Sequence, residues 1–250
     1  MEKKNGAHQV AFDPLQSPVL LDRFLTRQIV IILSESWTSY PARAFCIEKE
    51  TDTWSTVAGP FSAVVGSNGM AWDAGFTERN HSALTKKEGD RKAPAGVLRL
   101  IKAMGYSAAA PAGSAFPYEQ IHASSLCIDD PVSEHYNRIF DSPGPLNPIK
   151  VDWKSSEIMK RKDDLYKWLI VVDYNKQRPT PGAGSCIFMH VWRSKNRGTA
   201  GCTALSEADM TLLLEWLKPE LNPVLIQMPV SEYELRAPAW NLPLLDGPVR

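Results

Sequence analysis

Short apolar runs bounded by turn-forming residues dominate the hydrophobic pattern of this chain. Four β-prone runs come first, over residues 28–33, 42–48, 54–58 and 61–65, and Ser, Pro, Thr-Asp or Gly-Pro separates them. Runs this short and closely spaced are typical of hairpins. Residues 168–172 form the strongest β-run, and we expect this strand to pair with one at 185–192. Residues 224–228 predict one more strand, so the pattern as a whole predicts a mostly β fold.

Two long segments, residues 71–95 and 108–141, show no regular pattern. Between them, residues 96–104 are apolar enough to return to the core. The charged run at 86–92 is typical of a solvated surface, and residues 134–140 favour a single helical turn. Long ordered loops often shape binding sites, so we expect the two segments to border a substrate groove.

One helix is predicted with a defined start near residue 206. Ser206 is a good N-cap with Asp209 three residues later, and Leu205 and Met210 occupy the two positions of a hydrophobic staple. An apolar stripe follows at i, i+3, i+4 and i+7, made by Met210, Leu213, Leu214 and Leu217. Pro219 ends the helix.

The most specific chemistry lies between the strand at 185–192 and this helix. His190 stands in the strand, and Cys202 follows in a turn of small residues, Thr-Ala-Gly-Cys-Thr, just before the helix. Eleven residues, 191 to 201, separate the two, which is enough for the chain to fold back and bring imidazole and thiol together. A lone histidine in an apolar strand is usually a packed core residue, but this spacing favours a catalytic one.

A histidine beside a cysteine points to nucleophilic catalysis. A free thiol with a pKa of about 8.5 is only partly ionised at neutral pH, and a neighbouring imidazole that takes its proton activates it. We therefore expect Cys202 to react with alkylating reagents well below the usual pKa of a thiol. Backbone N–H groups of Ala200, Gly201 and Cys202 are candidates to stabilise the oxyanion of an attacked carbonyl. These residues outline an acyl-transfer site.

His190 and the run from Thr199 to Thr203 together resemble the signature of the L,D-transpeptidase catalytic domain, also called the YkuD domain. The resemblance extends over residues 28–229 and includes upstream segments at 66–72, 87–90, 93–96, 127–131 and 161–166. It implies a mostly β, sandwich-like or barrel-like catalytic domain with a few short helices. It also implies a cysteine acyltransferase that acts on peptidoglycan stem peptides, with Cys202 as nucleophile, His190 as base and a backbone carbonyl orienting the imidazole.

The chain departs from the family pattern at two positions. Many members have Gly directly after the histidine and Arg two residues after the cysteine, whereas this chain has Val191 and Ala204. The way a substrate carboxylate is held is therefore open. Candidates for substrate contacts are Tyr118, Tyr166, Trp192, Arg193 and Thr199.

The other cysteines allow several interpretations. Alternation along the strand places Cys186 on the same face as His190, which favours a packing role. Cys46 and Cys127 are able to form a disulfide in an oxidising compartment, but the sequence does not fix any pairing. Cys186, His190 and Cys202 are also potential zinc ligands, yet no C-x2-C pair and no fourth ligand accompany them. We expect no metal and no cofactor.

Composition and charge narrow the class of protein further. The 250 residues are 44% hydrophobic, and 28 basic residues balance 28 acidic ones. Zero net charge without a long Lys and Arg run argues against an electrostatic nucleic-acid footprint. We expect one domain over residues 28–229, an N-terminal extension over 1–27, and a mostly irregular C-terminal tail over 230–250, packed on the domain or trailing from it. We also expect a monomer.

The N-terminal residues indicate neither an export signal nor a membrane anchor. Residues 1–18 lack a basic region followed by an apolar core. Arg23 and Arg27 interrupt the apolar stretch at 19–33, which argues against a transmembrane helix. The resemblance implies a place in the periplasm or cell envelope, so export needs another route or a signal that has been removed.

Three functions remain open at this level. The thiolate, base and oxyanion donors are common to transpeptidation, in which an amine resolves the acyl-enzyme, and to L,D-carboxypeptidase action, in which water does. We favour transpeptidation because the long segments at 71–95 and 108–141 are able to exclude water and build an acceptor groove. A non-catalytic cell-wall-binding domain is the third alternative.

Overall fold

The computed structural model describes residues 21–73, 84–144 and 148–245. Most of the N-terminal extension predicted for 1–27 lies outside these ranges, as do residues 74–83 of the first irregular segment and the end of the tail at 246–250. A short 3-10 helix, Asp22–Phe24, precedes the first strand.

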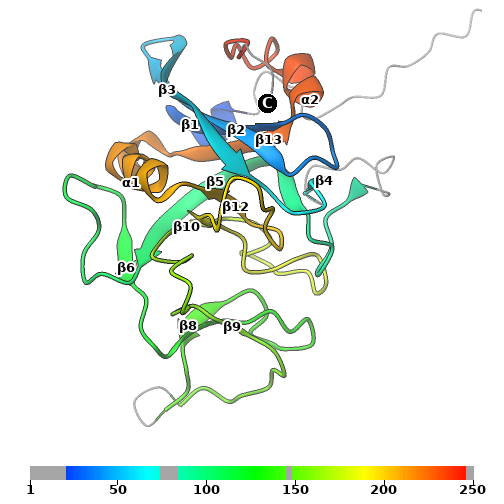
Figure 1. The fold of residues 1–250 in the computed structure, drawn as a ribbon, viewed down its shortest axis with the longest axis vertical. Coiled ribbons are helices and arrows are strands. Elements are labelled where there is room, and N and C mark those ends of the chain that lie inside the picture. Colours follow the sequence, from blue (N-terminus) through cyan, green and yellow to red (C-terminus); the bar gives the residue numbers. More distant parts are fainter. Residues whose placement is uncertain (1–20, 74–83, 145–147, 246–250) are drawn as a thin grey trace, which may run out of the picture.

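Ten strands form the main sheet, and the sheet closes on itself (Figure 1). They are β1 Gln28–Ser34, β2 Pro41–Glu50, β3 Thr53–Val64, β4 Met70–Trp72, β5 Ala93–Gly105, β6 Tyr118–Gln120, β10 Trp168–Val172, β11 Phe188–Val191, β12 Thr203–Leu205 and β13 Val224–Pro229. The strand order runs β10-β11-β12-β3-β2-β1-β13-β5-β4, and β6 pairs with β5. Because β10 also pairs with β5, the strands complete a barrel-like circuit. The mostly β, barrel-like fold expected from the sequence is confirmed.

Strand β1 forms the centre of the core. All seven of its residues are buried, between antiparallel β2 and parallel β13. Its run of Ile, Val and Leu suits a strand that is covered on both faces. Gln28 is tolerated there because its amide donates hydrogen bonds to Glu48 (2.9 Å) and to the Trp216 carbonyl oxygen (3.0 Å). The predicted strands at 54–58 and 61–65 are continuous in the structure as β3.

The predicted helix is present as α1, Glu207–Trp216. The Ser206 side chain accepts a hydrogen bond from the Asp209 backbone N–H at 3.1 Å, as expected of an N-cap. Met210, Leu213 and Leu214 are buried, and α1 packs against β10 and β11. A 3-10 turn, Pro219–Leu221, follows and leads into β13. The helix therefore helps to fix the strand that carries His190.

The tail is more regular than the sequence indicated. Residues Val230–Arg236 form a second helix, α2, which packs against β13 and β1. Tyr233, Trp240 and Leu242 are buried in the main core. The apolar spacing of Tyr233 and the residues after it, rather than the prolines, decides the structure here. None of the helices in the described ranges is long and apolar enough to cross a membrane.

A small three-stranded sheet lies at the other end of the molecule from α2 (Figure 1). Its strands are β7 Ser125–Cys127, β8 Ile139–Asp141 and β9 Glu157–Ile158, in the order β8-β7-β9. The prediction of an irregular segment at 108–141 is thus wrong for β6, β7 and β8. Residues 134–137 form turns that lead into β8 and no helix. Strands of only two or three residues leave little periodicity to detect.

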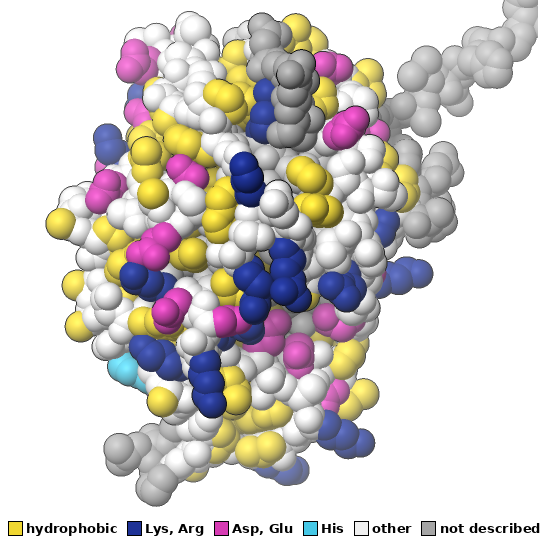
Figure 2. Space-filling view, in the orientation of Figure 1, with side chains coloured by type: hydrophobic (Ala, Val, Ile, Leu, Met, Phe, Trp, Pro, Cys, Tyr) yellow, Lys and Arg dark blue, Asp and Glu magenta, His cyan; other side chains and the backbone are white. Residues whose placement is uncertain are grey.

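Basic side chains gather near the middle of the face drawn in Figure 2, between the main sheet and the small sheet, with acidic side chains directly beside them. Opposite charges held this close create a local field although the net charge of the chain is zero.

Candidate active site

His190 is held in the middle of β11. It lies opposite Leu169 of β10 and Ala204 of β12, so the predicted pairing of the strands at 168–172 and 185–192 is confirmed. The ring is buried, and its Nδ1 lies 2.8 Å from the Val191 carbonyl oxygen. A carbonyl only accepts hydrogen bonds, so Nδ1 carries the proton and Nε2 keeps a free lone pair. A backbone carbonyl thus orients the imidazole, in agreement with the resemblance.

Cys202 ends a tight loop just before β12. The Thr199 hydroxyl donates to the Cys202 carbonyl oxygen at 2.6 Å and accepts from the Gly201 N–H at 3.1 Å. Gly201 has φ of +149°, a conformation that residues with a Cβ rarely adopt. The Ala200 and Cys202 N–H groups donate to no backbone acceptor within the described ranges. The loop therefore presents free N–H groups beside the thiol.

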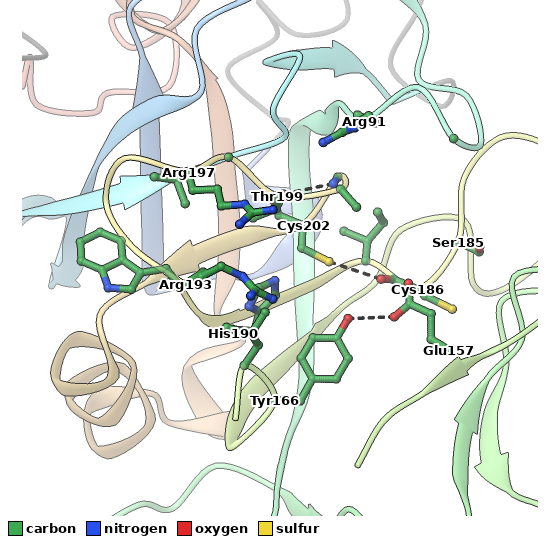
Figure 3. A pocket seen from close by; sticks show the side chains of 18 of the residues that line it. Arg91, Glu157, Tyr166, Ser185, Cys186, His190, Arg193, Arg197, Thr199 and Cys202 are labelled. Atoms are coloured by element: carbon green, nitrogen blue, oxygen red, sulfur yellow. Dashed lines mark hydrogen bonds between the residues drawn. The ribbon is translucent and has the colours of Figure 1, made fainter. Parts of the chain in front are cut away.

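The sulfur of Cys202 makes two contacts with the segment that leads into β11. The Phe188 N–H donates to Sγ at 3.4 Å. The thiol in turn donates to the Cys186 carbonyl oxygen at 3.5 Å (Figure 3). Cys202 and His190 are 8% and 6% exposed, and both line one cavity of about 410 Å³. The fold thus brings the two predicted reactive groups to the same cavity.

Both reactive groups are neutral at rest. Burial lowers the pKa of His190 to about 4, with the Val191 carbonyl acting against this shift. Burial, followed by the nearby Glu157 carboxylate, raises the pKa of Cys202 to about 12, while the Phe188 N–H and Lys86 act against this shift. The structure therefore favours a neutral thiol and imidazole over the readily alkylated thiolate expected from the sequence.

Cys186 forms a disulfide with Cys127, with a Cα–Cα distance of 6.0 Å. Cys186 is buried in a hydrophobic cluster, as its predicted packing role requires, but the sequence did not predict that it packs there as a disulfide. Cys46, offered as a partner of Cys127, is a free buried thiol of β2. Strand alternation does not extend to Cys186, because β11 begins at residue 188 and Cys186 lies before it with φ of +53°. The disulfide also removes Cys186 from any zinc site with His190 and Cys202, and the described residues contain no other cluster suited to a metal.

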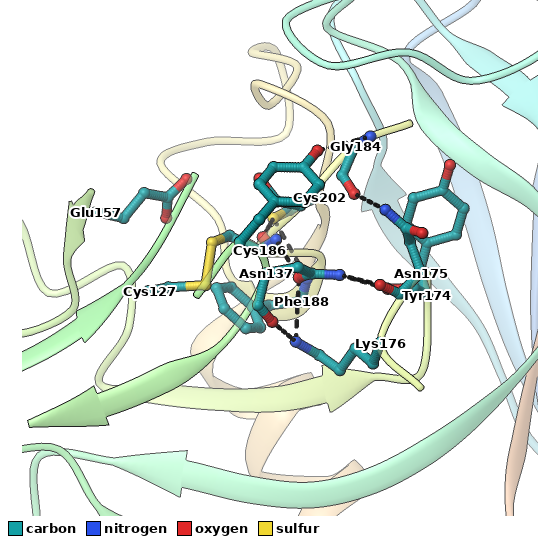
Figure 4. Close-up of a disulfide and its surroundings, with 12 residues drawn as sticks. Cys127, Asn137, Glu157, Tyr174, Asn175, Lys176, Gly184, Cys186, Phe188 and Cys202 are labelled. Atoms are coloured by element: carbon teal, nitrogen blue, oxygen red, sulfur yellow. Dashed lines mark hydrogen bonds between the residues drawn. A yellow bond between two sulfur atoms is a disulfide. The ribbon is translucent and has the colours of Figure 1, made fainter. Parts of the chain in front are cut away.

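Asn137 fixes the segment that carries Cys186 (Figure 4). Its buried side-chain amide donates to the carbonyl oxygens of Tyr174 (2.9 Å) and Asn175 (2.7 Å). Its Oδ1 accepts from the Cys186 N–H at 2.9 Å and from the Lys176 ammonium at 3.2 Å. All four hydrogen-bonding positions of the amide are therefore used. The carbonyl that contacts the Cys202 thiol is held by this amide and by the disulfide.

The cavity is lined by charged side chains, some of which come from the run at 86–92 that was expected to be a solvated surface. Among the described residues, its basic lining consists of Lys86, Arg91, Arg161, Arg193 and Arg197, and its acidic lining of Glu88 and Glu157. Lys86 is 3% exposed and donates to Asp90 at 2.7 Å, so the charged run at 86–92 is not a simple solvated surface. A Lys-rich run gives no sequence signal for such burial, because the pairing with Asp90 is what permits it.

Four of the five candidate substrate residues reach the cavity: Tyr166, Trp192, Arg193 and Thr199 line it, together with Ala200 and Gly201. Tyr118 does not. Its hydroxyl donates to the Ser107 carbonyl oxygen at 2.6 Å, and its ring packs edge-on against Trp168. Ala204, where many family members have Arg, is fully buried in β12 between β11 and β3. A large cation has no room at that position.

Glu157 is the most informative residue that the sequence analysis missed. It lines the cavity from the small sheet and accepts a hydrogen bond from the Tyr166 hydroxyl at 2.8 Å (Figure 3). A lone Glu in a polar segment carries no sequence signal, and only the fold brings it beside residues 166 and 202.

Comparison with protein families finds one match that spans most of the described domain. The model of the L,D-transpeptidase catalytic domain (YkuD) matches residues 42–226. No curated protein and no solved structure matches the chain. The matched range includes the strand that carries His190, the loop that carries Cys202 and the small sheet. The chain therefore belongs to the L,D-transpeptidase catalytic domain family.

Proposed function

We propose that this protein is a cysteine acyltransferase that acts on peptidoglycan stem peptides, with Cys202 as nucleophile and His190 as its base. The observation that carries the proposal is that both side chains line one cavity, with Nδ1 of His190 bound to a carbonyl and Nε2 free. A neutral imidazole with a free Nε2 is the form that accepts a proton from a thiol. Family membership supports the peptide substrate.

The first half-reaction forms a thioester. As Sγ of Cys202 attacks the carbonyl carbon of the stem-peptide bond, His190 takes the thiol proton and then returns it to the leaving amine. The buried pair does not hold separated charges at rest, so proton transfer accompanies the attack. The charge then sits on the oxyanion, where fixed donors stabilise it.

The loop from Thr199 to Cys202 supplies those donors. The N–H groups of Cys202 and Ala200 have no backbone acceptor in the described ranges, and each fixed donor aimed at an oxyanion contributes about 3 kcal/mol to such reactions. The Gly201 N–H becomes a third oxyanion donor only if its hydrogen bond to the Thr199 hydroxyl breaks. Thr199 thus positions the loop and controls this third donor.

Arginines at the rim take the place of the family arginine that Ala204 replaces. Arg91, Arg193 and Arg197 line the cavity and are exposed. A guanidinium binds a carboxylate through two parallel hydrogen bonds, so these side chains suit the terminal carboxylate of a stem peptide. The disulfide, which persists in oxidising compartments, supports the proposal that the protein works in the cell envelope.

Purified tetrapeptide muropeptides test the function directly. We expect cross-linked dimers by mass spectrometry after incubation with the protein, because the walls that residues 86–91 and 157–166 give the cavity favour an amine over water as the second nucleophile. Tripeptide and free D-Ala as the only products would make the protein an L,D-carboxypeptidase. A protein that yields no product and no covalent adduct with a carbapenem would be a binding domain. The Cys202→Ala variant serves as the control for spontaneous hydrolysis.

The pH dependence of acylation tests the state of His190. Because the pKa of His190 is lowered to about 4, the imidazole stays neutral through mildly acidic pH and loses its function as a base only near that value. We expect the rate of carbapenem adduct formation to stay flat from neutral pH downwards and to reach half its value near pH 4. Circular dichroism over the same range separates this loss from acid unfolding. Half-loss near the usual histidine value of 6.5 would show that the imidazole is solvated.

A further inference from the structure

Building on the proposed function, the geometry points to Glu157 and Tyr166 as the site that binds and deprotonates the amine of the acyl acceptor. Glu157 belongs to β9 of the small sheet, and Tyr166 to the segment just before β10. Both line the cavity that contains the nucleophile. A carboxylate there is a receptor for a cation, and an incoming acceptor amine is a cation at neutral pH.

The carboxylate of Glu157 is open to a ligand. Its described partner is the Tyr166 hydroxyl at 2.8 Å, and no salt bridge to it is found within the described ranges. The other acid of the cavity, Glu88, is already occupied, since it accepts from the Tyr136 hydroxyl at 2.5 Å and from the Ser185 hydroxyl at 2.7 Å. Of the two acids, Glu157 is therefore the one available to an ammonium group.

The fold ties Glu157 to the nucleophile from two sides. Opposite Glu157 in the small sheet stands Cys127, whose disulfide leads to Cys186, and the Cys186 carbonyl oxygen contacts the Cys202 thiol. On the other side, the Tyr166 ring packs edge-on against His190 with 5.3 Å between ring centroids. Figure 3 shows the Tyr166 hydroxyl pointing at Glu157, with Cys202 above them. A group bound at Glu157 thus lies beside both reacting residues.

The proposed step balances in protons and charge. The Glu157 carboxylate takes one proton from the acceptor ammonium, and the neutral amine attacks the thioester carbon. The C–S bond breaks, the C–N bond remains as the new amide, and a second proton from nitrogen passes through His190 to the Cys202 sulfur. Burial raises the pKa of Glu157, which makes it a better base toward an ammonium group. Burial also keeps Tyr166 protonated, since its pKa is raised, so its hydroxyl remains a donor that holds the carboxylate in place.

The test compares two acceptors of the acyl group: the stem-peptide amine, which is protonated at neutral pH, and hydroxylamine, which is neutral. With tetrapeptide muropeptides as donor and acceptor, we expect Glu157→Gln to lower the ratio of cross-linked dimer to hydrolysed product by about 100-fold, the scale of a lost general base. The rate of carbapenem acylation should not fall, because Glu157 acts as a base only after the acyl-enzyme forms, and loss of its charge lowers the pKa of Cys202. Hydroxylamine is a neutral nucleophile at neutral pH, so its capture of the acyl-enzyme should also stay unchanged. Glu134→Gln, the same substitution at an exposed site near the small sheet, is the matched control.

Two results would overturn the inference. One is an unchanged product ratio in Glu157→Gln, and the other is an equal loss of capture by hydroxylamine and by the stem-peptide amine, which would indicate a structural role. If Glu157→Gln fails to fold, Glu157→Ala is used, because it also removes the carboxylate, and an unchanged ratio there equally contradicts the inference. Absence of an acyl-enzyme in the wild-type protein would instead refute the proposed function.

Discussion

Replacing Cys202 by Ala is expected to abolish turnover, with a loss on the order of 10⁴-fold or more, as for other nucleophiles of acyl transfer. Without the sulfur, no thioester forms, and His190 has no proton to take. The change removes one buried atom from a loop held by Thr199, so we expect the free energy of unfolding to change by only about 1 kcal/mol. Muropeptide turnover, carbapenem adduct mass and urea unfolding measure the three effects.

Cys46 provides the matched control. It is the other free cysteine in the described ranges, it is buried in β2, and burial raises its pKa to about 12, as for Cys202. Cys46→Ala should therefore keep both turnover and the carbapenem adduct. A Cys202→Ala protein that still forms an adduct, or still turns over substrate, would refute the assignment of the nucleophile.

Removing the disulfide is expected to have the second-largest effect, on stability as well as activity. Cys127 and Cys186 are 59 residues apart, and closing a loop of this length stabilises a fold by about 4 kcal/mol through the entropy of the unfolded chain. The double variant Cys127→Ala with Cys186→Ala also frees the carbonyl that contacts the Cys202 thiol. We expect acylation to slow by at least about tenfold, because small misplacements of reacting groups are costly.

Reduction of the wild-type protein controls for the side effects of substitution. Dithiothreitol should lower the urea midpoint of the wild type toward that of the double variant and leave the double variant unchanged. The Asn137 amide still holds the Cys186 N–H in both proteins, so the fold should persist without the disulfide. Equal midpoints for oxidised and reduced wild type would contradict the expected stabilisation.

Local rules were sufficient for the elements that flank the reactive pair. The N-cap at Ser206 and the β-run at 168–172 are strong periodic signals, and both appear as predicted. Local rules did not predict the disulfide partner of Cys186. Its disulfide depends on a three-dimensional approach of two segments, and its φ of +53° interrupts the alternation from which its role was inferred.

The protonation states and charges of the site were the properties hardest to predict from the sequence. The ordinary pKa of a thiol beside histidine predicts ionisation, but burial of both groups favours their neutral forms. The charge of the cavity arises from residues scattered from Lys86 to Arg197. No local pattern indicates that these side chains share one cavity, so only the closed sheet reveals it.

The way the small sheet is attached to the barrel makes it an exchangeable module. The chain leaves the barrel after β6 and returns at β10, and both strands pair with the end of β5, where Gly105 lies opposite Gln120 and Trp168. A Cβ at Gly105 would lie 2.5 Å from the Lys167 carbonyl oxygen, so only glycine allows this junction. Because both ends meet at one residue, the parts of the inserted segment away from Cys127, Asn137 and Tyr166, which hold it to the barrel, are free to change length or sequence. Grafting this segment between relatives is therefore a route to transfer acceptor preference while the nucleophile stays in place.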